Sequence, residues 1–138
     1  MSKILHALVG AILVVGFAMA SAGTAGADTG YQDDCTLKLD EHQICRVWWF
    51  NEDLDLVGHV VFHLHDEKLG LVDFKADGRG LFVRISWGST YDQVYNTKGA
   101  SKAVWKDYNI ADGTLVYITA CQTDNGKELN CIRTHTYA

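Results

Sequence analysis

The chain has 138 residues, of which 48% are apolar, 21% charged and 11% aromatic, which is enough for one globular domain with its own core. Twelve Lys and Arg against 17 Asp and Glu give a net charge of -5, which argues against a nucleic-acid-binding protein and against a basic membrane-binding surface. The absence of proline excludes proline-rich linkers and polyproline segments.

Residues 1–27 have the composition of a secretory signal peptide. Lys3 supplies a positive start, and Ala7–Ala20 is an uncharged apolar run of 14 residues. Small residues follow, and Ala25–Ala27 forms an A-x-A cleavage site directly before the first acidic residue. We therefore expect cleavage after Ala27.

The alternative to cleavage is an uncleaved membrane anchor, because Ile4–Ala22 contains 19 residues interrupted by one histidine.

Cleavage would instead leave a single secreted, extracellular domain, residues 28–138, with no attachment to the membrane. This domain has 111 residues, and its net charge is -6 because the removed segment holds one lysine and no acid. A domain of this size has one core of marginal stability, so crosslinks would help it.

All four cysteines, Cys35, Cys45, Cys121 and Cys131, follow the predicted cleavage site. An even number in an exported chain favours two disulfides, for which three pairings are possible. Structural zinc sites use closely spaced cysteine pairs, whereas both spacings here are ten residues. We favour local pairing of Cys35 with Cys45 and of Cys121 with Cys131, each worth about 3 kcal/mol in the chain-entropy model.

The second pair flanks Asn125-Gly126, a strong hairpin signature. A three-residue loop centred on Gly126 would place Cys121 opposite Cys131, at a distance that a disulfide can bridge. A two-residue Asn-Gly turn would place Cys121 opposite Asn130 instead. The sequence leaves both loop types open.

Period-two alternation dominates after Cys45, and no stretch shows helical periodicity over three turns. The chain is therefore predicted to be all-β, as a small antiparallel β-sandwich or meander barrel with two disulfides. The predicted strands are Ile44–Phe50, Leu56–His65, Gly70–Lys75, Leu81–Trp87, Tyr91–Asn96, Lys102–Tyr108, Thr114–Cys121 and Leu129–Thr136.

Alternation also predicts which side chains face the core. In Leu81–Trp87 the odd-numbered residues are expected to point inward and the even-numbered ones, among them Arg84 and Ser86, toward water. Thr114–Cys121 carries apolar residues on both faces, which predicts a central strand covered on both sides.

Three histidines, His59, His63 and His65, share one face of the strand predicted over Leu56–His65. An H-x-H pair is used by zinc and copper sites, so these residues are candidate metal ligands, although no third element that completes the site is identifiable. Strand alternation with a polar outer face explains the same spacing.

The acidic run at Asp53 and Asp55, with Gly58 following, imitates the start of a calcium loop. The positions that would have to supply further oxygen ligands are Val57 and Leu64, so a solvated turn explains the run better.

The adjacent pair Trp48 and Trp49 must point to opposite faces of a strand, so one of the two is expected near the surface. These two residues are therefore candidate contacts for a protein or carbohydrate partner. Core filling explains many aromatic residues in small β domains equally well.

No catalytic motif with known spacing is present: the sequence has no G-x-S-x-G, H-E-x-x-H, P-loop or G-x-G-x-x-G segment. Paired cysteines would also leave no thiol nucleophile. A catalytic group assembled only in three dimensions would escape such a search.

The second half of the chain contains the glycine-punctuated segment Lys75–Gly80, the following Leu81–Trp87, then Val94–Gly99 and the hairpin Ala120–Cys131. These segments resemble small secreted actinobacterial β proteins of unknown function. The resemblance covers residues 70–138. It implies a secreted β-sandwich and carries over no catalytic residue.

The sequence thus favours a non-enzymatic extracellular binding or interaction module, with a protein or carbohydrate partner, of which an enzyme inhibitor would be one version. The alternative is a small extracellular metal-dependent hydrolase that uses His59, His63 and His65, and a third hypothesis is a self-associating cell-surface protein. No cofactor is expected unless the histidine face binds zinc or copper.

Overall fold

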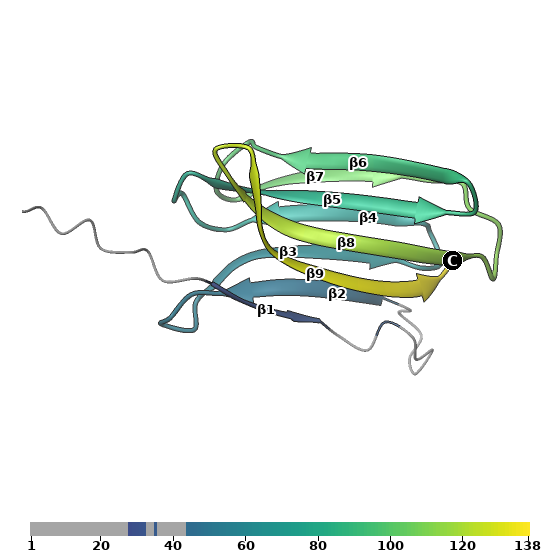
Figure 1. Ribbon diagram of the computed structural model, residues 1–138, viewed down its shortest axis with the longest axis horizontal. Coiled ribbons are helices and arrows are strands. Elements are labelled where there is room, and N and C mark those ends of the chain that lie inside the picture. Colours follow the sequence, from purple (N-terminus) through teal and green to yellow (C-terminus); the bar gives the residue numbers. More distant parts are fainter. Residues whose placement is uncertain (1–27, 33–34, 36–43) are drawn as a thin grey trace, which may run out of the picture.

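The computed structural model describes residues 28–32, 35 and 44–138, which form nine β-strands and contain no helix (Figure 1). The predicted signal peptide, residues 1–27, lies outside this part. The strands are β1 Thr29–Gln32, β2 Ile44–Phe50, β3 Leu56–His63, β4 Lys68–Asp73, β5 Arg79–Trp87, β6 Thr90–Asn96, β7 Lys102–Asp107, β8 Leu115–Asp124 and β9 Lys127–Tyr137. Within the described residues, no helix has the length and hydropathy needed to span a bilayer.

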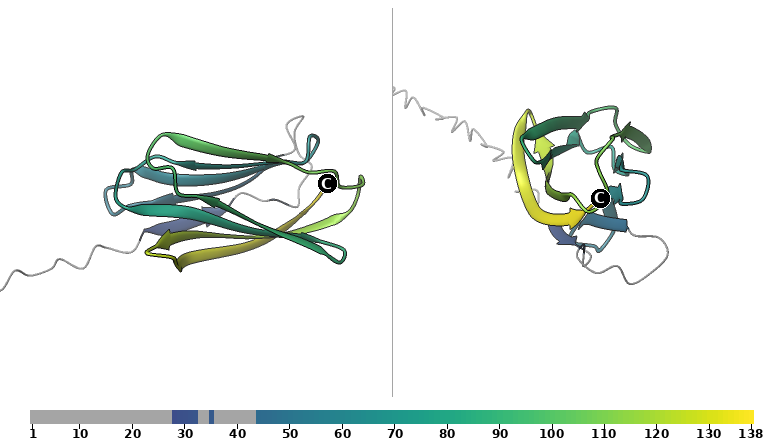
Figure 2. Two further views of the ribbon diagram at one scale, coloured as in Figure 1. Left: turned by 90° about the horizontal axis from the view of Figure 1, so that it is seen from above. Right: turned by 90° about the vertical axis from the view of Figure 1, so that its right-hand side faces the viewer.

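The strands form two antiparallel sheets that pack face to face (Figures 1 and 2). One sheet has the order β1-β2-β3-β4-β7 and the other the order β6-β5-β8-β9. No ladder of hydrogen bonds joins the two sheets among the described strands, so the sandwich, and not the closed barrel, is the form adopted.

The core lies between the two inner faces, as expected for a sandwich. Trp49, Phe62 and Leu71 enter it from the five-stranded sheet, and Ile85 and Ile118 from the four-stranded sheet, all with at most 2% of their surface exposed. Burial of such large apolar side chains is the main favourable contribution to folding.

All eight predicted strands are present, with boundaries that differ by up to three residues. The strand β1 was not predicted, because its sequence, TGYQ, has no clear alternation. The strand β3 ends at His63, earlier than predicted, and residues 64–67 form a turn.

The predicted alternation of Leu81–Trp87 is confirmed for the inward residues, but the prediction for the opposite face was wrong at Phe82. Its ring is fully buried although it points outward, because the ring of Tyr95 packs against it at 4.6 Å and the guanidinium of Arg84 lies 5.2 Å from its centroid. In β8, which lies between β5 and β9, Tyr117 is exposed, so this interior strand is not covered on both faces as predicted.

Both predicted disulfides, Cys35–Cys45 and Cys121–Cys131, are formed. The second hairpin has the two-residue turn: Asp124 pairs with Lys127, and Asn125 and Gly126 both have positive φ.

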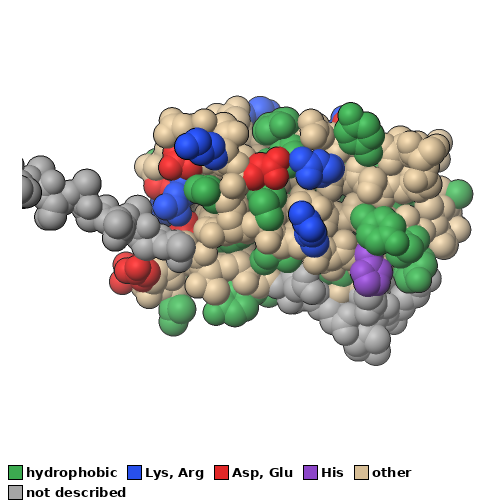
Figure 3. All heavy atoms as spheres, viewed as in Figure 1, with side chains coloured by type: hydrophobic (Ala, Val, Ile, Leu, Met, Phe, Trp, Pro, Cys, Tyr) green, Lys and Arg blue, Asp and Glu red, His purple; other side chains and the backbone are tan. Residues whose placement is uncertain are grey.

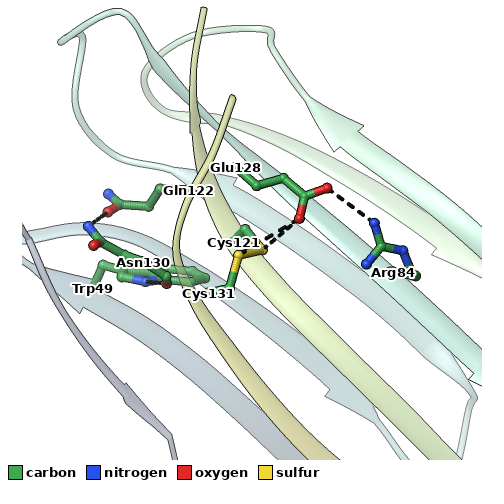
Figure 4. The surroundings of a disulfide bond; sticks show 7 residues. All are labelled: Trp49, Arg84, Cys121, Gln122, Glu128, Asn130 and Cys131. Atoms are coloured by element: carbon green, nitrogen blue, oxygen red, sulfur yellow. Dashed lines mark hydrogen bonds and ion pairs between the residues drawn. A yellow bond between two sulfur atoms is a disulfide. The ribbon is translucent and has the colours of Figure 1, made fainter. Parts of the chain in front are cut away.

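This turn alone would place Cys121 opposite Asn130, but the register shifts between Ala120 and Gln122. Asn130, with φ of 48°, is the extra residue of a β-bulge. The bulge brings Cys131 opposite Cys121, with a Cα–Cα distance of 4.1 Å (Figure 4).

The same bulge anchors a polar network that crosses the molecule. The backbone carbonyl of Asn130 accepts a hydrogen bond of 2.9 Å from the indole of Trp49 (Figure 4). The side-chain amide of Asn130 donates a hydrogen bond to the side-chain oxygen of Gln122. Gln122 in turn donates to the buried carboxylate of Asp28, which also pairs with Arg79. The network therefore ties the N-terminal residue of the described chain to both sheets.

Candidate functional site

The outer face of the five-stranded sheet carries an aromatic ring that rests on a glycine. Trp105 of β7 lies directly opposite Gly70 of β4. A Cβ atom added to Gly70 would approach ring atoms of Trp105 to 2.4–2.7 Å, so the indole lies against the glycine backbone. Trp105 is nevertheless 47% exposed. One part of the ring is thus supported by the sheet while another part is open to solvent.

Polar side chains surround this ring. The imidazole of His63 lies 6.0 Å from the ring of Trp105, and the ammonium of Lys68 lies 5.7 Å from its centroid. Together with Asp66 they line a shallow, open depression of about 340 Å³. The depression therefore combines an aromatic platform with an imidazole, an ammonium and a carboxylate, all of which form hydrogen bonds readily.

The two adjacent tryptophans separate as alternation predicts. Trp49 is fully buried and its indole is hydrogen-bonded inside the protein, so it has no surface to offer a partner. Trp48 is partly exposed on the outer face of the same sheet, where it lines a second shallow depression with Tyr31, Phe50 and Leu54. Of the two candidate contacts, only Trp48 remains.

The three histidines do not converge on one point. His59 and His63 lie on the outer face of β3, where His59 packs against Phe74 at 5.4 Å. His65 lies in the turn that follows the strand, so the H-x-H pair does not share a strand face. The three do not form a metal-ligand cluster in the described part of the chain.

Among the described residues, one group of three side chains of metal-binding type lies close enough together to hold a metal ion: Cys121, Glu128 and Cys131. Both cysteines are in the disulfide, so neither offers a thiolate. The carboxylate of Glu128 instead lies 3.1 Å from Arg84 and 3.8 and 3.9 Å from the two sulfur atoms (Figure 4).

The acidic residues Asp53 and Asp55 lie in a turn before β3, between Asn51 and the start of the strand. The side-chain oxygen of Asn51 accepts a hydrogen bond of 2.8 Å from the backbone of Asp55, and its amide donates to the Asp55 carboxylate. Asp53 and Leu54 are exposed at the tip. Hydrogen bonds within the chain thus hold Asn51 and Asp55 in this turn.

His59 of β3 and Asp73 of β4, both in the five-stranded sheet, have perturbed pKa values. Burial lowers the pKa of His59, and the charge of Arg46 lowers it further, so this imidazole is neutral at pH 7. Burial raises the pKa of Asp73, and the charge of Asp77 raises it further, whereas the backbone hydrogen bond from Lys75 lowers it. One carboxylate oxygen of Asp73 is buried and has no hydrogen-bond partner in the part of the chain that the structure describes.

No local sequence pattern distinguishes Trp105 from the other aromatic residues of the chain. What distinguishes it is its position opposite Gly70, which depends on the register between β4 and β7. These strands are separated in the chain by β5 and β6 of the other sheet, so no local pattern could reveal the contact.

No family model, curated protein or solved structure matches the chain.

Proposed function

We propose that this protein is a secreted, non-enzymatic binding module that holds a neutral carbohydrate on the outer face of its five-stranded sheet. The observation that carries the proposal is the indole of Trp105, supported by Gly70 and 47% exposed. An aromatic ring held rigidly at the surface loses little conformational freedom when the apolar face of a sugar ring stacks on it.

The surroundings of Trp105 support a sugar more than an apolar ligand. His63, Asp66 and Lys68 provide donors and acceptors at the rim of the depression, where sugar hydroxyls would meet them. The depression is open, which suits binding of a chain end or a chain segment better than a reaction that must exclude water.

Secretion is part of this proposal. All four cysteines form disulfides, which persist in oxidising compartments. Residues 1–27 have the features of a signal peptide that is cleaved before Asp28.

A protein partner is the second candidate. The second depression of the same sheet face is lined by Tyr31, Trp48, Phe50 and Leu54. Leu54 is 76% exposed. Tyr31 lies on β1, which is an edge strand of this sheet. A mostly apolar patch at a sheet edge is typical of protein contacts.

The test is binding of the mature, oxidised protein to a panel of soluble neutral polysaccharides, measured by affinity electrophoresis and calorimetry. We expect retention by at least one polysaccharide, and a loss of about fivefold or more in affinity for Trp105→Ala, because a nucleobase stacked on an aromatic side chain contributes about 1–3 kcal/mol and a stacked sugar ring is expected to contribute a similar amount. The matched control is Tyr137→Ala, which removes an exposed ring from the opposite sheet. Equal affinity of Trp105→Ala and the unmodified protein would refute the assignment of this face.

A further inference from the structure

The outer face of the four-stranded sheet carries a second set of side chains that the proposed function does not use. The registers of β6, β5, β8 and β9 place Tyr91, Ser86, Tyr117 and His135 side by side in one row. The next row, two residues along each strand, consists of Gln93, Arg84, Thr119 and Arg133. We call Tyr91, Tyr117, His135, Gln93, Arg84 and Arg133 the tyrosine–arginine face.

The two tyrosines of the first row are well exposed, Tyr91 by 69% and Tyr117 by 55%. They are separated by β5, so their backbones lie two strand spacings, about 10 Å, apart. The residue between them is Ser86, whose side chain is small. The ring of His135 lies 6.2 Å from that of Tyr117 and extends the row to β9.

The second row is cationic. Arg84 pairs with Glu128 at 3.1 Å, whereas none of the ion pairs found within the described residues includes Arg133, which is exposed. The eight residues of the two rows include no carboxylate. Figure 3 is viewed from the side of this sheet: cationic and hydrophobic side chains lie across its middle beside some acidic surface, and further acidic side chains gather at its left end.

This distribution contrasts with the charge of the whole chain. The predicted mature domain carries a net charge of -6. Yet this face holds the guanidinium of Arg133, which has no ion-pair partner among the described residues, and that of Arg84, which Glu128 neutralises. Local positive charge on an acidic protein selects for an anionic ligand, since the rest of the surface repels it.

We propose that the tyrosine–arginine face binds an anionic polysaccharide, a chain of sugar rings that bear carboxylate, sulfate or phosphate groups. The sugar rings stack on Tyr91 and Tyr117, and the guanidinium of Arg133 pairs with an anionic group about 7 Å away, the distance between two rows of a sheet. An acidic peptide matches the charge of the second row but has no regular ring faces for the first. This site is independent of the neutral-carbohydrate site, because it lies on the other sheet.

The test uses the mature protein with both disulfides intact and affinity electrophoresis through gels that contain polygalacturonate, dextran sulfate or neutral dextran. We expect retention in at least one anionic gel that exceeds any retention in neutral dextran. Arg133→Gln should weaken this retention by about tenfold, and Tyr91→Ser with Tyr117→Ser by at least as much. The exposure of all three positions means that these variants should fold normally.

Lys127→Gln is the matched control, because it removes the same charge from the same strand at the exposed hairpin turn. It should change retention by less than about twofold, as expected for a charge outside the site. Equal effects of Arg133→Gln and Lys127→Gln would show only non-specific attraction and overturn the proposal. Equal retention by polyglutamate would overturn the choice of a polysaccharide.

Trp105→Ala separates the two proposals. It should leave retention by the anionic gel unchanged, whether or not any neutral polysaccharide binds the other face. Loss of anionic retention in Trp105→Ala would place that site on the five-stranded sheet and contradict the inference.

Discussion

At the scale of single residues, the fold places one carboxylate in an unfavourable position. Asp73 is 5% exposed at the end of β4, and one of its oxygen atoms has no hydrogen-bond partner. Burial raises its pKa, which means that the folded protein binds a proton there more tightly than the unfolded chain does. The stability that protonation provides is therefore lost as the pH rises through the pKa of the folded state.

Asp73→Asn is expected to raise the free energy of unfolding at pH 7, because it removes a buried charge and keeps the oxygen that accepts the Lys75 backbone hydrogen bond. The gain should be smaller at pH 4 than at pH 7, because a falling pH protonates the wild-type carboxyl, whose pKa is raised. Urea unfolding at both pH values measures the effect, and the exposed Asp112→Asn is the control. A variant that is less stable than wild type at pH 7 would contradict this interpretation.

Gly70 is the residue on which the Trp105 platform depends. Gly70→Ala places a methyl group where ring atoms now lie, so the indole must move outward. We expect a red-shifted tryptophan emission and a loss of carbohydrate affinity of about tenfold, with the fold retained. Val72→Ala, on the same face of β4, is the matched control and should do neither. Unchanged affinity in Gly70→Ala would mean that the position of the ring is unimportant.

At the scale of elements, the hairpin β8–β9 shows how a turn and a bulge together determine a crosslink. The two-residue turn alone misaligns the cysteines by one position, and the bulge at Asn130 corrects this. Asparagine suits the position, since it tolerates positive φ better than most residues other than glycine.

Deletion of Asn130 is expected to keep the Cys121–Cys131 disulfide, because without the extra residue the two-residue turn itself places Cys131 opposite Cys121. Thiol titration of the purified variant in denaturant should detect no free thiol. Asn130→Gly keeps the positive φ and should also retain the disulfide, with a loss of about 1 kcal/mol from the missing hydrogen bond to Gln122. Two free thiols in the deletion variant would contradict the assignment of Asn130 as the extra residue of the bulge.

At the scale of the whole molecule, contacts at both edges join the two sheets. At one edge Asp92 of β6 accepts a hydrogen bond of 2.8 Å from Tyr108 and pairs with Lys106 of β7. At the other, Asp28 pairs with Arg79 of β5 and accepts a hydrogen bond from Gln122 of β8, directly before the edge strand β1. If Ala27 is the last residue of the signal peptide, the first residue of the mature protein is thus part of the folded structure.

Asp28→Asn is expected to lower the free energy of unfolding by about 2 kcal/mol, because Arg79 and Gln122 lose a buried anionic partner. Chemical unfolding of the mature protein measures the loss. The exposed Asp53→Asn is the control and should change stability by less than about 0.5 kcal/mol. A loss no larger than that of the control would show that Asp28 does not anchor the N-terminus.

The sequence was sufficient for the fold class, the eight longer strands and the disulfide pairing, since alternation and turn residues are local patterns. It was insufficient where the outcome depends on contacts between distant strands. The burial of Phe82 under Tyr95, the bulge at Asn130 and the position of Trp105 on Gly70 are all of this kind. The metal hypothesis rested on His65 as part of β3, and the strand ends two residues earlier.

The central claim is that the outer face of the five-stranded sheet binds carbohydrate. The most direct test is an NMR titration of the mature protein with a neutral oligosaccharide derived from a polysaccharide that it binds, in which the indole N–H resonances of the four tryptophans are followed. Trp105 is exposed, whereas the indole N–H of Trp49 is hydrogen-bonded inside the protein. We predict that the Trp105 resonance shifts with saturation while that of Trp49 stays unchanged. Saturable binding without a shift at Trp105 would contradict the claim.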